Sequence, residues 1–138
     1  MYLIDTNVVS ELRKGPRCHP GVRRFFRTAA SDALFIPAQV VGELRKGAEM
    51  IRLRNDRDQA DLLDRWLDMV LLEYRDRILD FDLECAQLWG RLMAKSPQHP
   101  IDRQIASIAL LYDFTVVTRN TSDFAGTGTP TLDPFLDH

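Results

Sequence analysis

The sequence predicts an α/β fold, with a central, mostly parallel sheet of four to five short strands flanked by helices. Short, apolar, β-prone segments alternate with longer segments whose apolar residues recur at helical spacing, a pattern typical of parallel strands connected by helices. The chain has 138 residues, the usual length of one domain, and 45% of them are hydrophobic, which argues against a disordered chain. We therefore expect residues 1–138 to form a single domain.

The N-terminal half is expected to contain two strands and three helical segments. In chain order these are a strand at 2–4, a helical turn at 8–12, a basic amphipathic helix at 22–30, a strand at 34–36 and a helix at 37–53. The first strand stops at Asp5, where polar residues able to cap a helix begin the helical turn. Pro37 favours a helix start, and the apolar stripe of its helix comprises Val40, Val41, Leu44, Ala48 and Ile51.

The C-terminal half continues the alternation of helices and strands. We expect helices at 58–73, 83–95 and 102–112, a possible strand at 78–79, a buried strand at 115–118 and an edge strand near 131–132. The first of these helices has an inner face of Leu62, Leu63, Trp66, Leu67 and Val70, and its aspartates should face solvent. The helix at 102–112 is apolar nearly all round, so it should lie centrally.

Composition excludes several classes of protein. No apolar run approaches the roughly 20 residues of a membrane span, and the N-terminus lacks the basic and apolar regions of a signal peptide. Cys18 and Cys85 are far apart and form no CxxC pair, so we expect neither a disulfide framework nor a thiolate zinc site. A cytoplasmic protein is the expectation that fits these features.

The formal net charge of −2 conceals an uneven distribution of charge. Residues 1–57 hold 11 Lys/Arg and 6 Asp/Glu, whereas residues 58–138 hold 7 and 14. Basic side chains clustered on one surface could contact phosphate groups of RNA, although solvated helix faces explain the same residues without a function.

Four carboxylates occupy positions that a hydrophobic core disfavours. Asp5 follows the first strand and Asp123 lies in the loop after residues 115–118, so both fall beyond the carboxyl ends of strands, where parallel sheets bind ligands. Asp102 opens the buried helix and shares its apolar face. Glu43 borders the apolar stripe of the helix at 37–53.

Each acid also has a purely structural interpretation. Asp5 and Asp102 could cap helices, Asp123 could form an Asx-turn, and Glu43 could be a surface residue at the edge of its stripe. Together, however, four carboxylates at one edge of a sheet would repel one another and need a divalent cation. Oxygen ligands suit Mg²⁺ or Mn²⁺, and such sites perform phosphoryl chemistry.

Four short motifs resemble those of a known family. They are Leu3-Ile4-Asp5-Thr6-Asn7, Val41-Gly42-Glu43-Leu44, Ile101-Asp102-Arg103-Gln104-Ile105-Ala106 and Val117-Thr118-Arg119-Asn120-Thr121-Ser122-Asp123-Phe124. In this order and spacing they are similar to the acidic motifs of PIN domains, and more narrowly to those of VapC-type toxins of type II toxin–antitoxin modules. The resemblance covers nearly the whole chain.

The resemblance implies a metal-dependent endoribonuclease that inhibits translation and growth. Its Mg²⁺ or Mn²⁺ site would comprise Asp5, Glu43, Asp102 and Asp123, with Glu43 binding through water or orienting the nucleophile. Supporting polar groups would be Thr6, Asn7, Thr118 and Asn120. A metal-activated water would cleave a structured RNA, leaving a 5′-phosphate and a 3′-hydroxyl. The implied partners are a cognate antitoxin that holds the enzyme inactive and a second copy, in a homodimer or in a toxin–antitoxin hetero-oligomer.

Two other functions compete with this interpretation. The chain could be a non-catalytic module that binds RNA or a protein partner, with its acids serving as caps. A haloacid-dehalogenase-type phosphatase also begins with a strand ending in Asp, but it needs a second acid where this chain has Asn7. Among the histidines, His99 could approach the site three residues before Asp102, but we expect an exposed loop residue. No residue selects which RNA would be cut.

Overall fold

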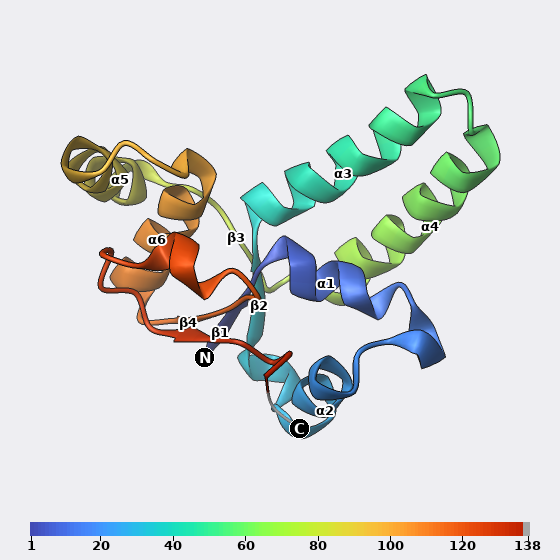
Figure 1. Cartoon of the computed structure of the whole chain (residues 1–138), viewed down its shortest axis with the longest axis horizontal. Coiled ribbons are helices and arrows are strands. Elements are labelled where there is room, and N and C mark those ends of the chain that lie inside the picture. The colour runs from blue at the N-terminus through green and yellow to red at the C-terminus, as the bar shows by residue number, and fades with distance from the viewer. Residues whose placement is uncertain (137–138) are drawn as a thin grey trace.

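Five short parallel strands form the centre of the computed structural model, which describes residues 1–136 (Figure 1). Their order in the sheet is β3-β2-β1-β4-β5. The strands are β1 (Tyr2–Ile4), β2 (Leu34–Pro37), β3 (Ile78–Leu79), β4 (Thr115–Val117) and β5 (Thr131–Leu132). Every neighbouring pair is parallel, so the predicted α/β fold with a parallel sheet is confirmed.

Helices connect the strands and cover the sheet. They are α1 (Thr6–Leu12), α2 (Pro20–Thr28), α3 (Ala38–Leu53), α4 (Arg57–Glu73), α5 (Leu83–Lys95) and α6 (Pro100–Tyr112). Three short 3₁₀ turns, η1 (Gly15–Arg17), η2 (Ser31–Ala33) and η3 (Thr121–Phe124), complete the elements. None of the helices within residues 1–136 is long and apolar enough to cross a membrane.

Strand β1 occupies the middle of the sheet because its side chains pack on both faces. Leu3 and Ile4 are fully buried, and β1 pairs with β2 on one side and β4 on the other. The register sets Ile4 opposite Val117, so both strands end at the same edge of the sheet. The residues that follow β1 and β4 are thereby brought together, although more than a hundred positions separate them in sequence.

Helix α6 is the central helix that the sequence predicts. Ile105, Ala106, Ile108 and Ala109 are almost fully buried, as their all-round apolar pattern requires. The helix begins at Pro100 rather than at Asp102, because Pro100 fits the first helical turn, where its missing N–H leaves no hydrogen bond unmade.

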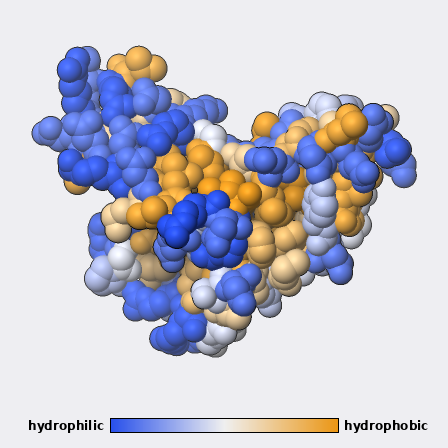
Figure 2. Space-filling view, turned by 180° about the vertical axis from the view of Figure 1, so that it is seen from behind, coloured by the Kyte–Doolittle hydropathy of each residue, from blue (hydrophilic) through white to orange (hydrophobic). Residues whose placement is uncertain are grey.

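Helices α3 and α4 form an antiparallel hairpin, the α3–α4 arm, which projects from the sheet on the opposite side from α5 and α6 (Figure 1). The hairpin turns at Asn55, whose φ of 65° is a left-handed conformation that asparagine tolerates better than most residues. Seen from behind, a notch separates the arm from the α5–α6 side, and hydrophobic residues gather near the centre of that face (Figure 2).

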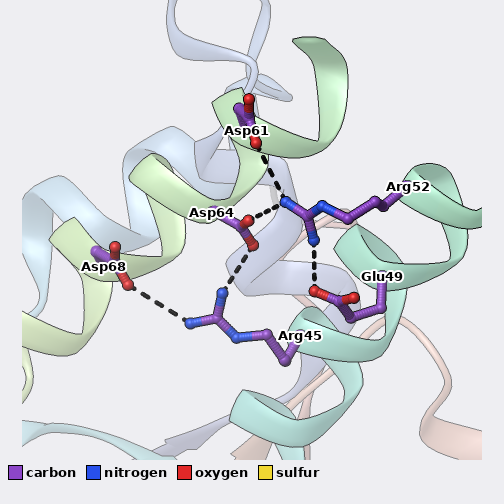
Figure 3. Close-up of polar contacts among 6 residues, drawn as sticks. All are labelled: Arg45, Glu49, Arg52, Asp61, Asp64 and Asp68. Atoms are coloured by element: carbon purple, nitrogen blue, oxygen red, sulfur yellow. Dashed lines mark hydrogen bonds and ion pairs between the residues drawn. The ribbon is translucent and has the colours of Figure 1, made fainter. Parts of the chain in front are cut away.

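Ion pairs join the two helices of the arm (Figure 3). Arg45 contacts Asp64 at 2.7 Å and Asp68 at 3.5 Å, and Arg52 contacts Asp61 at 3.2 Å and also binds Asp64. Asp58, Asp61 and Asp68 are exposed, as the sequence predicts, but Asp61, Asp64 and Asp68 also pair with arginines of α3, which the sequence did not predict. Helical periodicity identifies the outward face of α4 but cannot show that an arginine of α3 reaches it.

Leu62 does not lie on the inner face of α4, where the sequence predicts it. Leu62 is 55% exposed, whereas Leu63 and Leu67 are buried. Because residues 62 and 63 differ by 100° around a helix, both cannot face the centre of the same seam.

Candidate metal centre

The carboxylate of Asp5, at the end of β1, is almost fully buried. Asp5 is 5% exposed and is the N-cap residue of α1, with Oδ1 accepting a 2.8 Å hydrogen bond from the backbone N–H of Thr6. Its other oxygen, Oδ2, accepts a 2.8 Å hydrogen bond from Thr118 Oγ1. Burial raises the pKa of Asp5, and these two donors oppose that shift by stabilising the charged form.

Thr118 connects the supporting polar groups around Asp5. It is fully buried just after β4, and its Oγ1 accepts hydrogen bonds from the backbone N–H of Asn120 at 3.0 Å and from Asn7 Nδ2 at 3.2 Å. Asn7 Oδ1 in turn accepts a 2.9 Å bond from the backbone N–H of Arg119. The residues after β1 and after β4 are therefore joined by one network that ends on the Asp5 carboxylate.

Glu43 reaches the same region from the α3–α4 arm. Its side chain is exposed, but Oε1 accepts a 2.6 Å hydrogen bond from Thr6 Oγ1, directly beside Asp5. Thr6 thus contacts two of the predicted acids at once, through its N–H and through its hydroxyl.

The charges of the other three acids affect the pKa of Asp102. Its pKa is raised to about 6, first by burial and then by the charges of Asp5, Asp123 and Glu43. Contacts also relate the four acids in space, because Thr6 bonds to both Asp5 and Glu43, and His99 lies 3.9 Å from Asp102 and 3.6 Å from Asp123. The structure therefore brings the four predicted acids to one edge of the sheet.

The structural alternatives fit Asp5 and Glu43 but not the other two acids. Glu43 is exposed, as a surface residue at the edge of its stripe would be. Asp5 does cap α1, so a structural role accounts for part of its environment. Asp102 is the third residue of α6, whose N-cap is His99, so it is not a cap. Among the described residues, the carboxylate of Asp123 accepts no hydrogen bond from the backbone of η3, so it makes no Asx-turn.

His99 lies within the acidic cluster, closer than its sequence position suggested. Its Nδ1 is 3.9 Å from Asp102 Oδ2, and its Nε2 is 3.6 Å from Asp123 Oδ1. About half of its side chain is exposed, as expected for a loop residue, but the ring faces the acids. The signal in the sequence was its spacing of three residues from Asp102, which places both side chains near the first turn of α6.

These side chains have the composition of a divalent metal site. Within residues 1–136, ligand atoms of His99, Asp102 and Asp123 lie within 4.8 Å of one another. Asp5 and Glu43 add two further carboxylates whose charges reach the same point. Carboxylates that repel one another are stabilised when a cation binds between them.

Comparison with known proteins identifies the family of this chain. Residues 2–128 match the model of the PIN domain family. The chain is 34% identical to the plasmid stability protein StbB of Pseudomonas syringae pv. tomato over 98% of this chain and 99% of that protein. It is 29% identical to the VapC ribonuclease Y4jK of Sinorhizobium fredii over 98% of both chains. Its fold matches the crystal structure of FitAcB from Neisseria gonorrhoeae with a TM-score of 0.86, at 27% identity and 99% coverage of each.

Replacing Thr118 with valine should destabilise the protein, because the substitution removes the donor to Asp5 and the acceptor for two N–H groups while keeping the side-chain shape. We expect the free energy of unfolding, measured by urea denaturation, to fall by about 1–3 kcal/mol. Thr115→Val is the matched control, since Thr115 begins β4 and its hydroxyl makes no hydrogen bond within the described residues. Equal losses in both variants would contradict the network.

Replacing Asp102 with asparagine should stabilise the metal-free protein at neutral pH. The pKa of Asp102 is raised to about 6 in the folded state, so its ionised form disfavours folding above that pH, and protonation relieves the effect as the pH falls toward 4. In EDTA, we expect a melting temperature roughly 2–6 °C higher than wild type at pH 7.5, and little difference at pH 4.

The control for that experiment is Asp80→Asn, which alters an exposed acid outside the cluster. It should change the melting temperature by less than about 2 °C. A lower melting temperature for Asp102→Asn at pH 7.5 would show that the acids do not repel one another as described.

Proposed function

Because this chain belongs to the PIN domain family, we propose that it is a divalent-metal-dependent endoribonuclease of the VapC type, held inactive by a cognate antitoxin. The observation that supports the proposal is the placement of four acids near the ends of β1 and β4: Thr6 contacts Asp5 and Glu43, and His99 lies within 4 Å of Asp102 and Asp123. The name of one relative, a VapC ribonuclease, supports RNA as the substrate.

The donor set fits a hard divalent cation. Asp5, Asp102 and Asp123 would bind it directly, and Glu43 would bind through water, because Glu43 is the most exposed of the four and already accepts a hydrogen bond from Thr6. When bound, Mg²⁺ or Mn²⁺ supplies a Lewis acid that favours deprotonation of a water and stabilises negative charge on a phosphoryl group.

The chain's own residues hold these groups in place for hydrolysis. Thr118 and the N–H of Thr6 fix the two oxygens of Asp5, and the hydroxyl of Thr6 fixes Oε1 of Glu43. Oε2 of Glu43 has no hydrogen-bond partner within the described residues, so it can orient an attacking water. Direct attack by water needs no covalent intermediate and would leave a 5′-phosphate and a 3′-hydroxyl.

Ribonuclease activity should depend on both the metal and the acids. We expect EDTA to abolish cleavage of structured RNA and Mg²⁺ or Mn²⁺ to restore it. Asp5→Asn and Asp102→Asn should each lower the cleavage rate at least ~100-fold, because each removes a charged ligand. Gel analysis of cleavage products and growth of cells expressing each variant without the antitoxin provide the two measurements.

Glu84→Gln is the control for these variants, because Glu84 is an exposed acid on α5 away from the cluster. It should cleave RNA and arrest growth as the wild type does. Cleavage that resists EDTA, or a folded Asp102→Asn variant with the wild-type rate, would contradict the proposal. RNA binding without cleavage in any divalent metal would favour the alternative of a non-catalytic module.

An apolar groove beside the acids suits an antitoxin segment. It runs between α1, α3 and α4 and is lined by Thr6, Ser10, Arg13, Glu43, Leu44, Gly47, Ala48, Ile51, Leu63, Trp66 and Leu67. Thr6 and Glu43 belong both to this groove and to the acidic cluster. An amphipathic peptide bound in the groove would therefore lie next to the cluster and obstruct access of RNA. The homodimer implied by the family resemblance stays a prediction.

Filling the groove should release the enzyme from its antitoxin. Gly47 lies on α3 and lines the groove, and a Cβ added there would meet no atom within 4 Å, so Gly47→Leu would place its side chain in groove space. We expect at least ~10-fold weaker binding of the protein encoded by a small reading frame directly upstream, with RNA cleavage retained. Calorimetry of the purified pair measures this change.

The matched control is Gly90→Leu, because Gly90 lies on α5 with equally open space around it. Both substitutions replace a helical glycine, so both should favour the helix to a similar extent. Antitoxin binding that Gly47→Leu leaves unchanged would exclude this groove as the docking site.

A further inference from the structure

His99 is the one histidine among residues 1–136 that faces the acidic cluster. Its ring lies between a carboxylate of α6 and a carboxylate of η3, with one nitrogen directed toward each. His19, by contrast, caps α2 through a hydrogen bond that its Nδ1 accepts from the N–H of Gly21. His138 lies outside the described residues.

The backbone around His99 is held by several contacts. His99 itself has a φ of 50°, a left-handed conformation that costs a non-glycine residue on the order of 1 kcal/mol. Its carbonyl accepts a 3.0 Å hydrogen bond from the N–H of Arg103. The guanidinium of Arg103, a residue only 5% exposed, donates to the carbonyl of Gln98 at 2.5 Å and to Ser96 Oγ at 3.1 Å. The loop before His99 and His99 itself are thus both bonded to Arg103 of α6.

An imidazole changes the chemistry of a site otherwise built from carboxylates. Mg²⁺ prefers oxygen donors and retains its water ligands, whereas Mn²⁺ accepts imidazole nitrogen as well as carboxylate oxygen. Two ligand atoms at about 2.0–2.2 Å from one cation lie at most about 4.4 Å apart. The mutual limit of 4.8 Å for His99, Asp102 and Asp123 therefore requires only small side-chain movements.

We propose that His99 contributes a ring nitrogen to the metal centre and makes the site selective for Mn²⁺ over Mg²⁺. The inference rests on the proposed function, since it assigns an additional ligand to the same centre. A neutral imidazole would bind the cation directly, beside the carboxylates of Asp102 and Asp123.

Electron spin-echo envelope modulation of the Mn²⁺-loaded protein, purified without a histidine tag, tests the direct bond. Coupling between Mn²⁺ and ¹⁴N should be present in the wild type and absent in His99→Asn. Asparagine tolerates the left-handed backbone and offers an oxygen in place of nitrogen. A variant with both His19→Asn and His138→Gln, which retains only His99, should keep the coupling.

Calorimetric titration with Mn²⁺ and with Mg²⁺ tests the selectivity without measuring activity. The ratio of Mn²⁺ to Mg²⁺ affinity should fall at least ~10-fold in His99→Asn. An unchanged ratio, or a wild-type protein that binds Mn²⁺ without ¹⁴N coupling, would overturn the proposal and leave His99 as a neighbour of the two acids with no part in metal binding.

Asp102→Asn separates failure of this inference from failure of the proposed function. If Asp102→Asn loses Mn²⁺ binding while His99→Asn behaves as the wild type, the carboxylate centre stands and the role of His99 does not. If the wild type binds neither cation, both proposals are overturned.

Discussion

The structure around the acidic edge of the sheet depends on one constraint, the free-energy cost of burying the Asp5 carboxylate beside three other acids. Asp5 can lie at the end of the central strand only because Thr118 and the N–H of Thr6 donate to its two oxygens. Those donors do not offset the combined effect of burial and of the neighbouring charges, since the pKa of Asp5 remains raised, as does that of Asp102. The acidic edge of the sheet therefore has excess negative charge, and a divalent cation offsets that charge more effectively than local hydrogen bonds do.

The acids come from separate parts of the fold, so the packing of those parts sets the spacing of the site. Glu43 lies on the α3–α4 arm, Asp102 on α6, and Asp5 at the end of β1 between them (Figure 1). Ion pairs from Arg45 and Arg52 hold α3 against α4 (Figure 3). On the other side, the buried Arg103 fixes the loop that carries His99. The charged residues outside the site thus help to fix the positions of those inside it.

Hydrophobic periodicity was sufficient to predict the strands and helices, because burial on one face leaves a repeat that can be read along the chain. The same pattern failed where contacts join elements that are distant in sequence. It placed Leu62 on the inner face of α4, and it gave no indication that Arg45 and Arg52 are paired with aspartates rather than free to contact RNA. The surplus of basic residues in the N-terminal half is consequently smaller at the surface than a count of residues suggests.

The order of the acidic motifs indicated the family and the residues that would form the site. Asp5 and Asp123 follow strands, Asp102 lies in the first turn of a helix, and Glu43 borders an apolar stripe, all of which the local sequence defines. Which groups surround those acids was decided only by the fold. The parallel pairing of β1 with β4 brings Thr118 to Asp5, and the left-handed turn at His99 directs an imidazole toward Asp102 and Asp123. Strand order and loop geometry arise from long-range packing, which no local periodicity encodes.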